Sequence, residues 1–403
     1  MRRSLPVAPA TILIGCGFLV DFYVAMVSLG TQNLGIYVMD VVPVILGLFA
    51  TVGSVAYTVG CLISGTISDR YGRRRCALIG CAGAAAAWSL MPHAPDWRFV
   101  LLLVIVPGLS LSMFWPSVQA WLAELAGSDR RKLSTYIGRF NILWCAGLML
   151  GPVATGYLWD WNWRATFYIP AALMLLVVVL VAFTARPSSA TAEAIPPLNG
   201  AHENTTLFLK LAWVGNFASF FSTRTVSAMF PALGAEMQFS HPLVGWLLFS
   251  VGAGQILIFA YTSWEHRWQY RLWPMVAAQA AAAMGMVLAA LGQQPMAFAA
   301  GFALVGVSAG VTYVSSLFYA LHGRNRGRGK TSGFHEAVLG GGVLLGPLLG
   351  GIAAQELSFR APFAIAAGVL ITACVVQAWL LAADRAKQAA LTPVAAGRDG
   401  QEE

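Results

Sequence analysis

Apolar runs of about 20 residues recur along this 403-residue chain, and short segments between them carry most of the charge. A helix needs roughly 20 apolar residues to cross a hydrocarbon layer about 30 Å thick. The pattern therefore predicts an all-α integral membrane protein of twelve transmembrane helices. The expected spans are 8–30, 42–65, 75–92, 98–123, 133–158, 165–185, 207–233, 243–263, 272–292, 296–321, 331–354 and 361–383.

Lys and Arg are divided very unevenly between the two sides that these spans define. With both termini on one side, that side holds 21 of them, the other holds only Arg98, Arg164 and Arg360, and Arg224 alone lies deep within a span. We name these faces the arginine-rich side and the outer side. Because basic residues are retained in the cytoplasm, the N and C termini are predicted to be cytoplasmic. The formal net charge of +8 is then a topology signal, and no nucleic-acid partner is expected.

The composition and the absence of known catalytic motifs limit the classes of function that the protein could have. The chain is 58% hydrophobic and 10% charged, which indicates a multi-pass protein of a plasma (inner) membrane. Its six cysteines lie in or at the ends of the spans without metal-ligand spacing, so no metal site is expected. We find no phosphate-binding loop, zinc motif or nucleophile elbow. The sequence therefore favours a protein that is not an enzyme, uses no cofactor and draws its energy from gradients.

One polar, proline-bearing interruption divides the chain, and the sequence on its two sides repeats. Residues 1–185 form the first predicted bundle, 186–206 a cytoplasmic linker, 207–383 the second bundle and 384–403 a disordered cytoplasmic tail. Internal repeats are typical of transporters built from duplicated bundles. Two aromatic pairs match between spans 4 and 10, Trp115 with Tyr313 and Trp121 with Tyr319. A glycine and proline pattern matches between spans 5 and 11, giving six candidate helix-bending residues: Gly147, Gly151, Pro152, Gly342, Gly346 and Pro347.

A glycine-rich and charged turn joins the second and third spans. Asp69 is an acid among arginines there, so it can pair locally or cap the N-terminus of a neighbouring helix. Gly72 permits the reversal of the chain. The alternative is a simple positive-inside anchor. The candidate conformational latch consists of Gly65, Asp69, Arg70, Gly72, Arg73 and Arg74.

These six residues resemble the loop pattern of the major facilitator superfamily, Gly-x-x-x-Asp-Arg-x-Gly-Arg-Arg, position by position. The resemblance implies two six-helix halves that rock about a central site, with this loop as a latch. The Gly-Pro step in span 5 is also partly similar to the bending motif of the superfamily's drug and proton antiporters. Those antiporters carry an arginine in span 4, and residues 101–109 of this chain contain none.

Two opposite charges lie inside predicted spans, Asp21 in span 1 and Arg224 in span 7. An ionisable group near the bilayer centre costs about 2.5–3.5 kcal/mol and needs a partner or a water-filled cavity. Aligning Phe18 with Phe221 places Asp21 opposite Arg224 in the repeat. Since spans 1 and 7 face each other in the superfamily, this predicts a pair that bridges the halves when the outer side is closed. The alternatives are a permanent structural pair, or an Arg224 that binds an anionic substrate while Asp21 holds it between cycles.

Span 11 carries a candidate proton site, His335 and Glu336, near its arginine-rich end. Burial raises the pKa of a carboxylic acid towards neutrality, and histidine titrates at about pH 6.5, so such a pair is suited to binding a proton. Glu336 also has a structural interpretation, snorkelling to the surface or pairing with Arg139. A proton is accordingly the candidate coupling ion.

Aromatic and amide side chains at helical spacing complete the candidate cavity. Spans 4 and 10 line the cavity in the superfamily's fold, and aromatic groups there suit an organic or amphipathic ligand. Interfacial or packing aromatics are the alternative. The remaining candidates are Phe22, Tyr23, Trp115, Gln119, Asn141, Tyr313 and Tyr319.

The sequence predicts a monomeric secondary active transporter that moves a small organic solute across the bilayer by alternating access, in efflux or in metabolite transport. The first alternative is a facilitator without ion coupling. The second is a transporter-shaped protein that acts in assembly or sensing and moves nothing.

Overall fold

The computed structural model describes residues 8–127, 129–184, 204–321 and 328–391, and it contains helices and no strand in these ranges. Each of the twelve predicted spans overlaps one long helix, so the predicted fold class is confirmed. The helices are α1 Pro9–Asn33, α2 Pro43–Tyr71, α3 Arg73–Leu90, α4 Trp97–Ala126, α5 Arg130–Asn162, α6 Ala165–Phe183, α7 Thr205–Glu236, α8 His241–Trp264, α9 Trp273–Leu291, α10 Pro295–Leu321, α11 Arg328–Glu356 and α12 Ala361–Leu391. A π-helical turn, Leu34–Val38, extends α1, and a 3-10 turn, Met91–His93, follows α3.

Within the described residues, eleven helices are long and apolar enough to cross a membrane. The exception is α7, which carries Arg224 and the hydroxyl side chains of Ser219, Ser222, Thr223 and Ser227. It is nevertheless among the most buried helices of the protein. Its polarity is therefore shielded from lipid by its neighbours, as is usual for polar residues at membrane depth.

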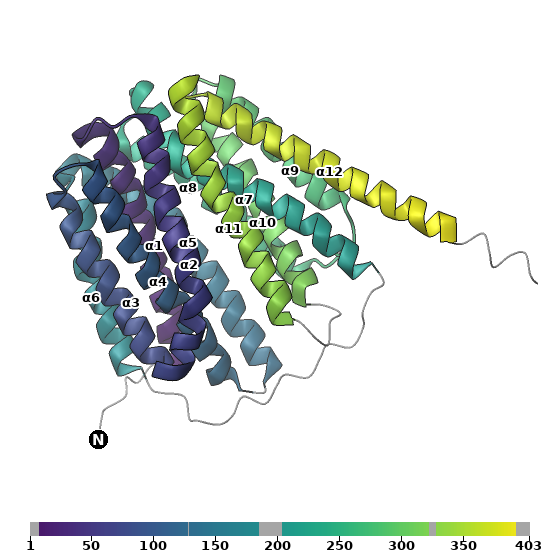
Figure 1. Ribbon diagram of the computed structural model, residues 1–403, viewed down its shortest axis with the longest axis horizontal. Coiled ribbons are helices and arrows are strands. Elements are labelled where there is room, and N and C mark those ends of the chain that lie inside the picture. The colour runs from purple at the N-terminus through teal and green to yellow at the C-terminus, as the bar shows by residue number, and fades with distance from the viewer. Residues whose placement is uncertain (1–7, 128, 185–203, 322–327, 392–403) are drawn as a thin grey trace, which may run out of the picture.

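The helices pack in two sets of six with the same internal arrangement. In the first set α1 packs on α5 and α2 on α4, and in the second α7 packs on α11 and α8 on α10 (Figure 1). Of the predicted linker, 186–206, residues 186–203 lie outside the described residues, whereas Thr205 and Thr206 already belong to α7.

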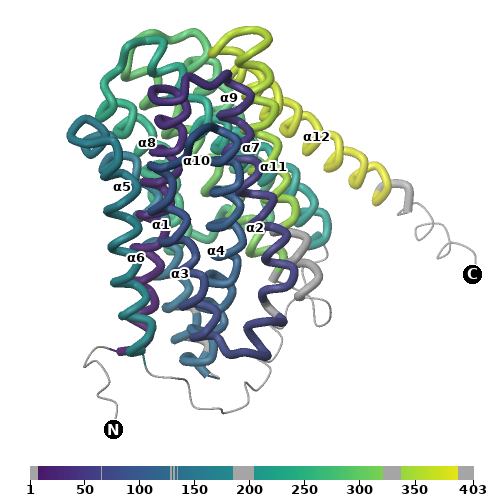
Figure 2. The backbone as a smooth tube through the Cα atoms, turned by 60° about the vertical axis from the view of Figure 1, so that its left-hand side comes forward, coloured from purple at the N-terminus to yellow at the C-terminus, as the bar shows by residue number. Residues whose placement is uncertain are grey.

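The two halves touch mainly along two edges, where α2 meets α11 and α5 meets α8. The specific contacts that cross between the halves, such as Thr51 with Leu344 and Gly156 with His241, lie in the parts of these helices nearest the outer side. Towards the end at which α1 begins, the two bundles diverge (Figures 1 and 2). The conformation is therefore closed on the outer side and spread on the arginine-rich side.

Glycine brings the backbones together along both edges. A Cβ on Gly47 of α2 would meet the carbonyl oxygen of Pro347 in α11, and one on Gly245 of α8 would meet that of Pro152 in α5. The two contacts are symmetric equivalents of each other. Without a side chain, each glycine allows the close helix approach that membrane interfaces use. We name this pair of contacts the glycine seam.

Each of the three arginines of the outer side contacts an aromatic ring or backbone carbonyl groups. Arg98 lies over the ring of Trp97 and Arg164 over that of Trp163, at 5.0 and 4.4 Å from the ring centroids. Arg360 donates to the carbonyl oxygens of Ala290 and Gly292 at 3.0 and 2.7 Å, at the C-terminal end of α9. That position is favourable for a cation because the helix dipole places partial negative charge there.

The predicted boundary of the C-terminal tail is wrong in part. Residues 384–391 continue α12 as helix, and Gln388 donates to Asp384 at 2.9 Å across one turn. Alanine, lysine, arginine and glutamine in this segment are strong helix formers, so the helix runs on beyond its apolar part. Residues 392–403 lie outside the described residues.

Candidate functional site

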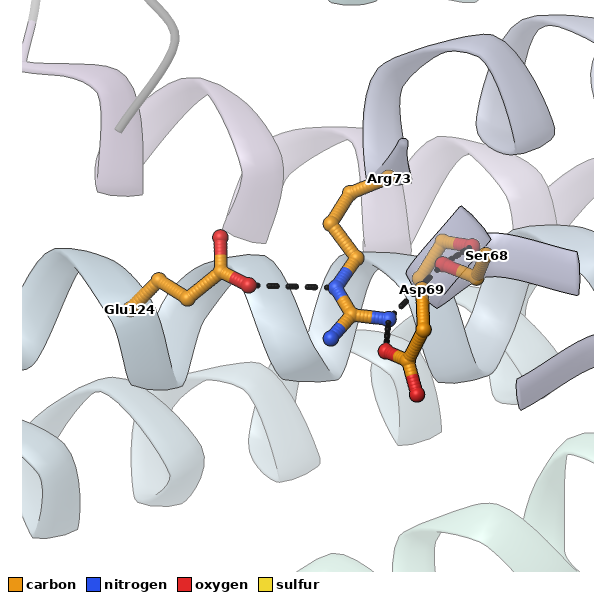
Figure 3. Close-up of polar contacts among 5 residues, drawn as sticks. Ser68, Asp69, Arg73 and Glu124 are labelled. Atoms are coloured by element: carbon orange, nitrogen blue, oxygen red, sulfur yellow. Dashed lines mark hydrogen bonds and ion pairs between the residues drawn. The ribbon is translucent and has the colours of Figure 1, made fainter. Parts of the chain in front are cut away.

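The latch turn is organised by one arginine. The Arg73 guanidinium contacts Asp69 at 2.5 Å, Glu124 at 3.1 Å and the Ser68 hydroxyl at 3.0 Å (Figure 3). Ser117 of α4 donates to the same Ser68 hydroxyl at 2.9 Å. The end of α2, the start of α3 and the end of α4 are thus tied together within the first half.

This arrangement corresponds to local pairing of Asp69, one of the two possibilities that the sequence left open. Gly72 has φ of 91°, a left-handed conformation that favours glycine, and the chain reverses there as expected. Arg70 lies over the ring of Tyr71 at 5.6 Å, while Arg74 is partly buried. The surroundings of Gly65 and the side chains of the first turns of α11 lie outside the described residues.

Sequence reasoning missed Glu124 and Ser117, which are more than 40 residues away in α4. Only the packing of α4 against α2 brings them to the turn. A single acid near the end of a span gives no sequence signal of its own.

We expect Asp69→Asn to lower the transport rate while leaving the apparent substrate affinity almost unchanged. The change removes one of the two carboxylates that hold Arg73 at the turn and touches no group in the centre of the protein. Transport kinetics in proteoliposomes, together with distances between labels on the two halves, measure both effects. Normal kinetics and normal distances would reduce the turn to a topology anchor.

The two intramembrane charges lie near each other without pairing. Asp21 is buried and Arg224 partly buried, and each is within electrostatic range of the other. Among the described residues no ion pair joins them, although the outer side is closed. The prediction of a bridge in the outer-closed state is therefore wrong.

The reason is the register of α1 against α7, which the glycine contacts reveal. Gly147 of α5 lies against the carbonyl oxygen of Phe18, and its repeat partner Gly342 of α11 lies against that of Phe217. Phe18 is accordingly equivalent to Phe217, and the predicted match with Phe221 is wrong by four residues.

In this corrected register Asp21 corresponds to Phe220, and Arg224 corresponds to Ala25. The two charges are displaced from symmetry by one helical turn, or about 6 Å along the axis. The two side chains therefore do not occupy equivalent positions in the two halves.

Several buried polar atoms of the second half have no hydrogen-bond partner among the described residues. They include Nε of Arg224, both amide atoms of Asn216 in α7 and Nε2 of Gln255 in α8. An unsatisfied buried polar atom costs about 1–3 kcal/mol. Their concentration in and beside α7 marks this region as suited to a polar ligand or to bound water.

The predicted cavity residues of the first half differ in exposure. Phe22 and Trp115 are partly buried, Tyr23 is buried and Gln119 is exposed. Trp115 packs edge-on against Phe140 of α5 at 5.6 Å. Asn141 accepts a hydrogen bond from the Trp144 indole at 3.2 Å.

In the second half the two predicted cavity tyrosines lie in different environments. Tyr313 is partly buried between Phe220 and Phe259, at centroid distances of 6.1 and 5.9 Å. Tyr319 is fully buried, and its hydroxyl accepts the backbone N–H of Tyr270 at 2.7 Å. The prediction that Tyr319 lines the cavity is wrong, because it anchors the turn before α9. The side chains of His335 and Glu336 lie outside the described residues.

The candidate helix-bending glycines serve as packing surfaces. Gly151 lies against the Phe22 carbonyl oxygen of α1, and Gly346 against the Phe221 carbonyl oxygen of α7. Each therefore holds a cavity helix of its own half closely, while Pro152 and Pro347 form the glycine seam with the opposite half. No cluster of His, Cys, Asp and Glu that could hold a metal is found in the part of the chain that the structure describes.

A polar cluster fastens the halves at the outer end of the α5–α8 edge. His241 Nδ1 and Asp160 Oδ1 are 2.5 Å apart, and the Trp246 indole donates to the Tyr157 hydroxyl at 3.2 Å. Tyr37 lies edge-on to His241 at 4.7 Å. No sequence signal indicated this outer cluster, since its members are dispersed at the ends of three helices.

We expect Asp160→Asn to weaken closure of the outer side, because it removes the charged partner of His241 at a contact between the halves. An exposed pair contributes about 0–1 kcal/mol, so the shift in population should be up to about fivefold. Distances between spin labels across the outer side measure it. Asp129→Asn, an exposed acid of the arginine-rich side, is the control. Equal effects of the two variants would contradict a role in closure.

A family model described as Major Facilitator Superfamily matches residues 11–322 and 212–400 of the chain. Among curated relatives, the Multidrug resistance protein MdtG of Citrobacter koseri is 26% identical over 337 residues, covering 76% of this chain and 77% of that protein. An uncharacterized MFS-type transporter of Mycobacterium tuberculosis, Rv0849, is 28% identical over 117 residues. The match spans only 27% of that relative's length.

Two solved structures share the fold at low sequence identity. A nucleoside transporter, NupG, superposes with a TM-score of 0.70 at 12% identity, covering 92% of this chain and 99% of its own. A D-xylose–proton symporter superposes with a TM-score of 0.71 at 15% identity, covering 91% and 96%. At such identities the likeness extends to the fold alone.

Proposed function

Since the chain belongs to the major facilitator superfamily and is a multi-pass inner-membrane protein, we propose that it is a secondary active transporter of a small organic solute. It works by alternating access, the superfamily's mode of action. Both termini are cytoplasmic in this proposal, as the distribution of arginines predicts, so the conformation described here faces the cytoplasm.

The observation that carries the proposal is the pair of unpaired central charges in a conformation closed on one side. Among the described residues, the buried Nε of Arg224 has no hydrogen-bond partner and the Asp21 carboxylate makes no ion pair. A static structural protein would gain by pairing these groups, because each is costly in the membrane when alone. A site that must admit a ligand keeps them apart.

The charges favour an anionic solute and a coupled proton. Asp21 and Arg224 together are neutral, so an anionic group that binds Arg224 leaves Asp21 without a counter-charge. Uptake of one proton by Asp21 restores neutrality. In this proposal one proton moves together with one anionic group, and arginine suits carboxylate or phosphate through paired hydrogen bonds.

A second candidate is drug efflux, favoured by the name of the relative MdtG. An exported cation would bind Asp21 rather than Arg224 and exchange for a proton. An uncoupled facilitator would need neither charge.

A thermal-shift comparison of the purified protein tests the proposal, since a ligand of the folded state raises its apparent stability. The panel pairs organic carboxylates and phosphate esters with neutral amides and organic cations of the same shape. We expect shifts from anions only, larger at low pH. Shifts from cations alone would favour efflux, whereas equal shifts from neutral compounds would favour a facilitator.

Uptake assays in proteoliposomes then separate transport from binding. Accumulation of a stabilising anion should require an inward proton gradient. Binding without any flux under all gradients would support the sensing alternative and overturn the proposed transport.

A further inference from the structure

A groove on the second half has no role in the transport site described above. It lies between α7, α11 and α12 and has a volume of about 890 Å³. Along α12 it extends from Ile365 to Leu380, which corresponds to about 22 Å of helix. One leaflet of a bilayer has a hydrocarbon depth of about 15 Å. The groove is long enough to receive a lipid chain.

The lining is largely apolar. Among the described side chains that line it, Lys210 is the only charged one, and the Thr372 hydroxyl and the Trp213 indole N–H are the other polar groups. Lys210 is exposed near the start of α7, on the arginine-rich side, and no ion pair of the described residues includes it. A chain-shaped apolar surface therefore ends at a cation.

Glycines keep this groove open. A Cβ on Gly368 of α12 would meet nothing within 4 Å, and one on Gly341 of α11 would meet only the Phe217 ring at 3.5 Å. Larger side chains at these positions would occupy the space.

We infer that the groove binds one anionic phospholipid, with an acyl chain between α7, α11 and α12 and the headgroup phosphate at Lys210. Each buried methylene of the chain adds favourable free energy. Basic residues between transmembrane helices on the cytoplasmic side are suited to anionic headgroups. A snorkelling lysine without a ligand would need no groove beneath it.

Native mass spectrometry of the full-length protein tests the inference, with dioleoylphosphatidylglycerol and dioleoylphosphatidylcholine as probes. We expect the wild type to retain phosphatidylglycerol about fivefold better than phosphatidylcholine, the ratio expected of one lysine at an anionic headgroup. Lys210→Gln should remove this preference but leave the chain bound. Lys132→Gln, an exposed lysine of the same side in the first half, should retain it.

Gly368→Leu should abolish retention of both lipids, because it fills the groove. The open space around Gly368 makes the variant compatible with folding, which its thermal transition checks independently. Equal retention of both lipids by the wild type, or unchanged retention in Gly368→Leu, would overturn the inference. The inference would also be overturned if free glycerol phosphate stabilised the protein as much as phosphatidylglycerol does. That result would indicate a site for simple anions. A dimer that Gly368→Leu dissociates would assign the groove to a second copy of the chain.

Discussion

Arg224→Gln is expected to abolish binding and transport of the anionic solute. The substitution removes the positive charge that lies deepest inside a predicted span and leaves Asp21 without a counter-charge. That change costs about 2.5–3.5 kcal/mol at the bilayer centre, unless Asp21 takes up a proton. The thermal shift produced by the best anion of the panel measures binding, and proteoliposome uptake measures transport. Retained binding in Arg224→Gln would contradict the proposed site.

Asp21→Asn should have a different signature. A neutral side chain at this position imitates the protonated acid, so Arg224 should bind the anion at any pH. Exchange of labelled for unlabelled anion should continue, while accumulation driven by a proton gradient should be lost. Loss of binding in Asp21→Asn would instead assign the solute contact to Asp21, as the efflux candidate requires.

The double variant Asp21→Asn with Arg224→Gln separates folding from function. Since both charges are removed, thermal stability should recover towards that of the wild type, but binding should not. Recovery of transport would mean that the two charges serve only the structure.

Gly245→Leu is expected to prevent closure of the outer side. Its side chain would meet the carbonyl oxygen of Pro152 at the glycine seam, where the backbones are already in contact. Overpacking of this kind costs about 1–3 kcal/mol, which changes the ratio of two states by about 5–150-fold. Transport should fall by a similar factor, because one of the two states becomes rare. Gly47→Leu on the symmetric edge should act in the same way.

Spin labels at Trp161 and Gln293 measure this effect, since both positions are exposed on the outer side of opposite halves. The two partly exposed cysteines, Cys61 and Cys374, are replaced first. Gly15→Leu is the matched control, because a Cβ there has nothing within 4 Å. A distance distribution in Gly245→Leu that matches the control would show that the seam does not limit closure.

The twelve helices could be predicted because a span needs only length and apolarity, both of which are local. The register of α1 against α7 could not be predicted, because Phe, Ala and Met recur too often in both helices for a sequence alignment to define it. The contacts of Gly147 and Gly342 with neighbouring backbones do fix it, and they exist only after packing. For this reason the predicted match of Asp21 with Arg224 was wrong.

Helical spacing also could not distinguish residues that line the cavity from residues that are buried in the core of a bundle. Trp115 and Tyr313 are partly buried, but Trp121 and Tyr319, six residues further along, are fully buried on both halves. The members of each matched pair, Trp115 with Tyr313 and Trp121 with Tyr319, therefore have similar burial in α4 and α10. The sequence repeat could not indicate which environment each pair has, because this depends on the neighbouring helices.

The two edges of the outer side are fastened unequally, and this inequality sets an order of events. The α5–α8 edge carries the outer cluster of His241, Asp160, Trp246 and Tyr157. Among the described side chains, the α2–α11 edge has one such contact, the Thr51 hydrogen bond to the Leu344 carbonyl at 3.1 Å. No ion pair of the described residues crosses the second edge. When the outer side opens, the α2–α11 edge should part first while α5 and α8 still act as the hinge. The solute would then enter or leave through a sideways gap rather than along the central axis.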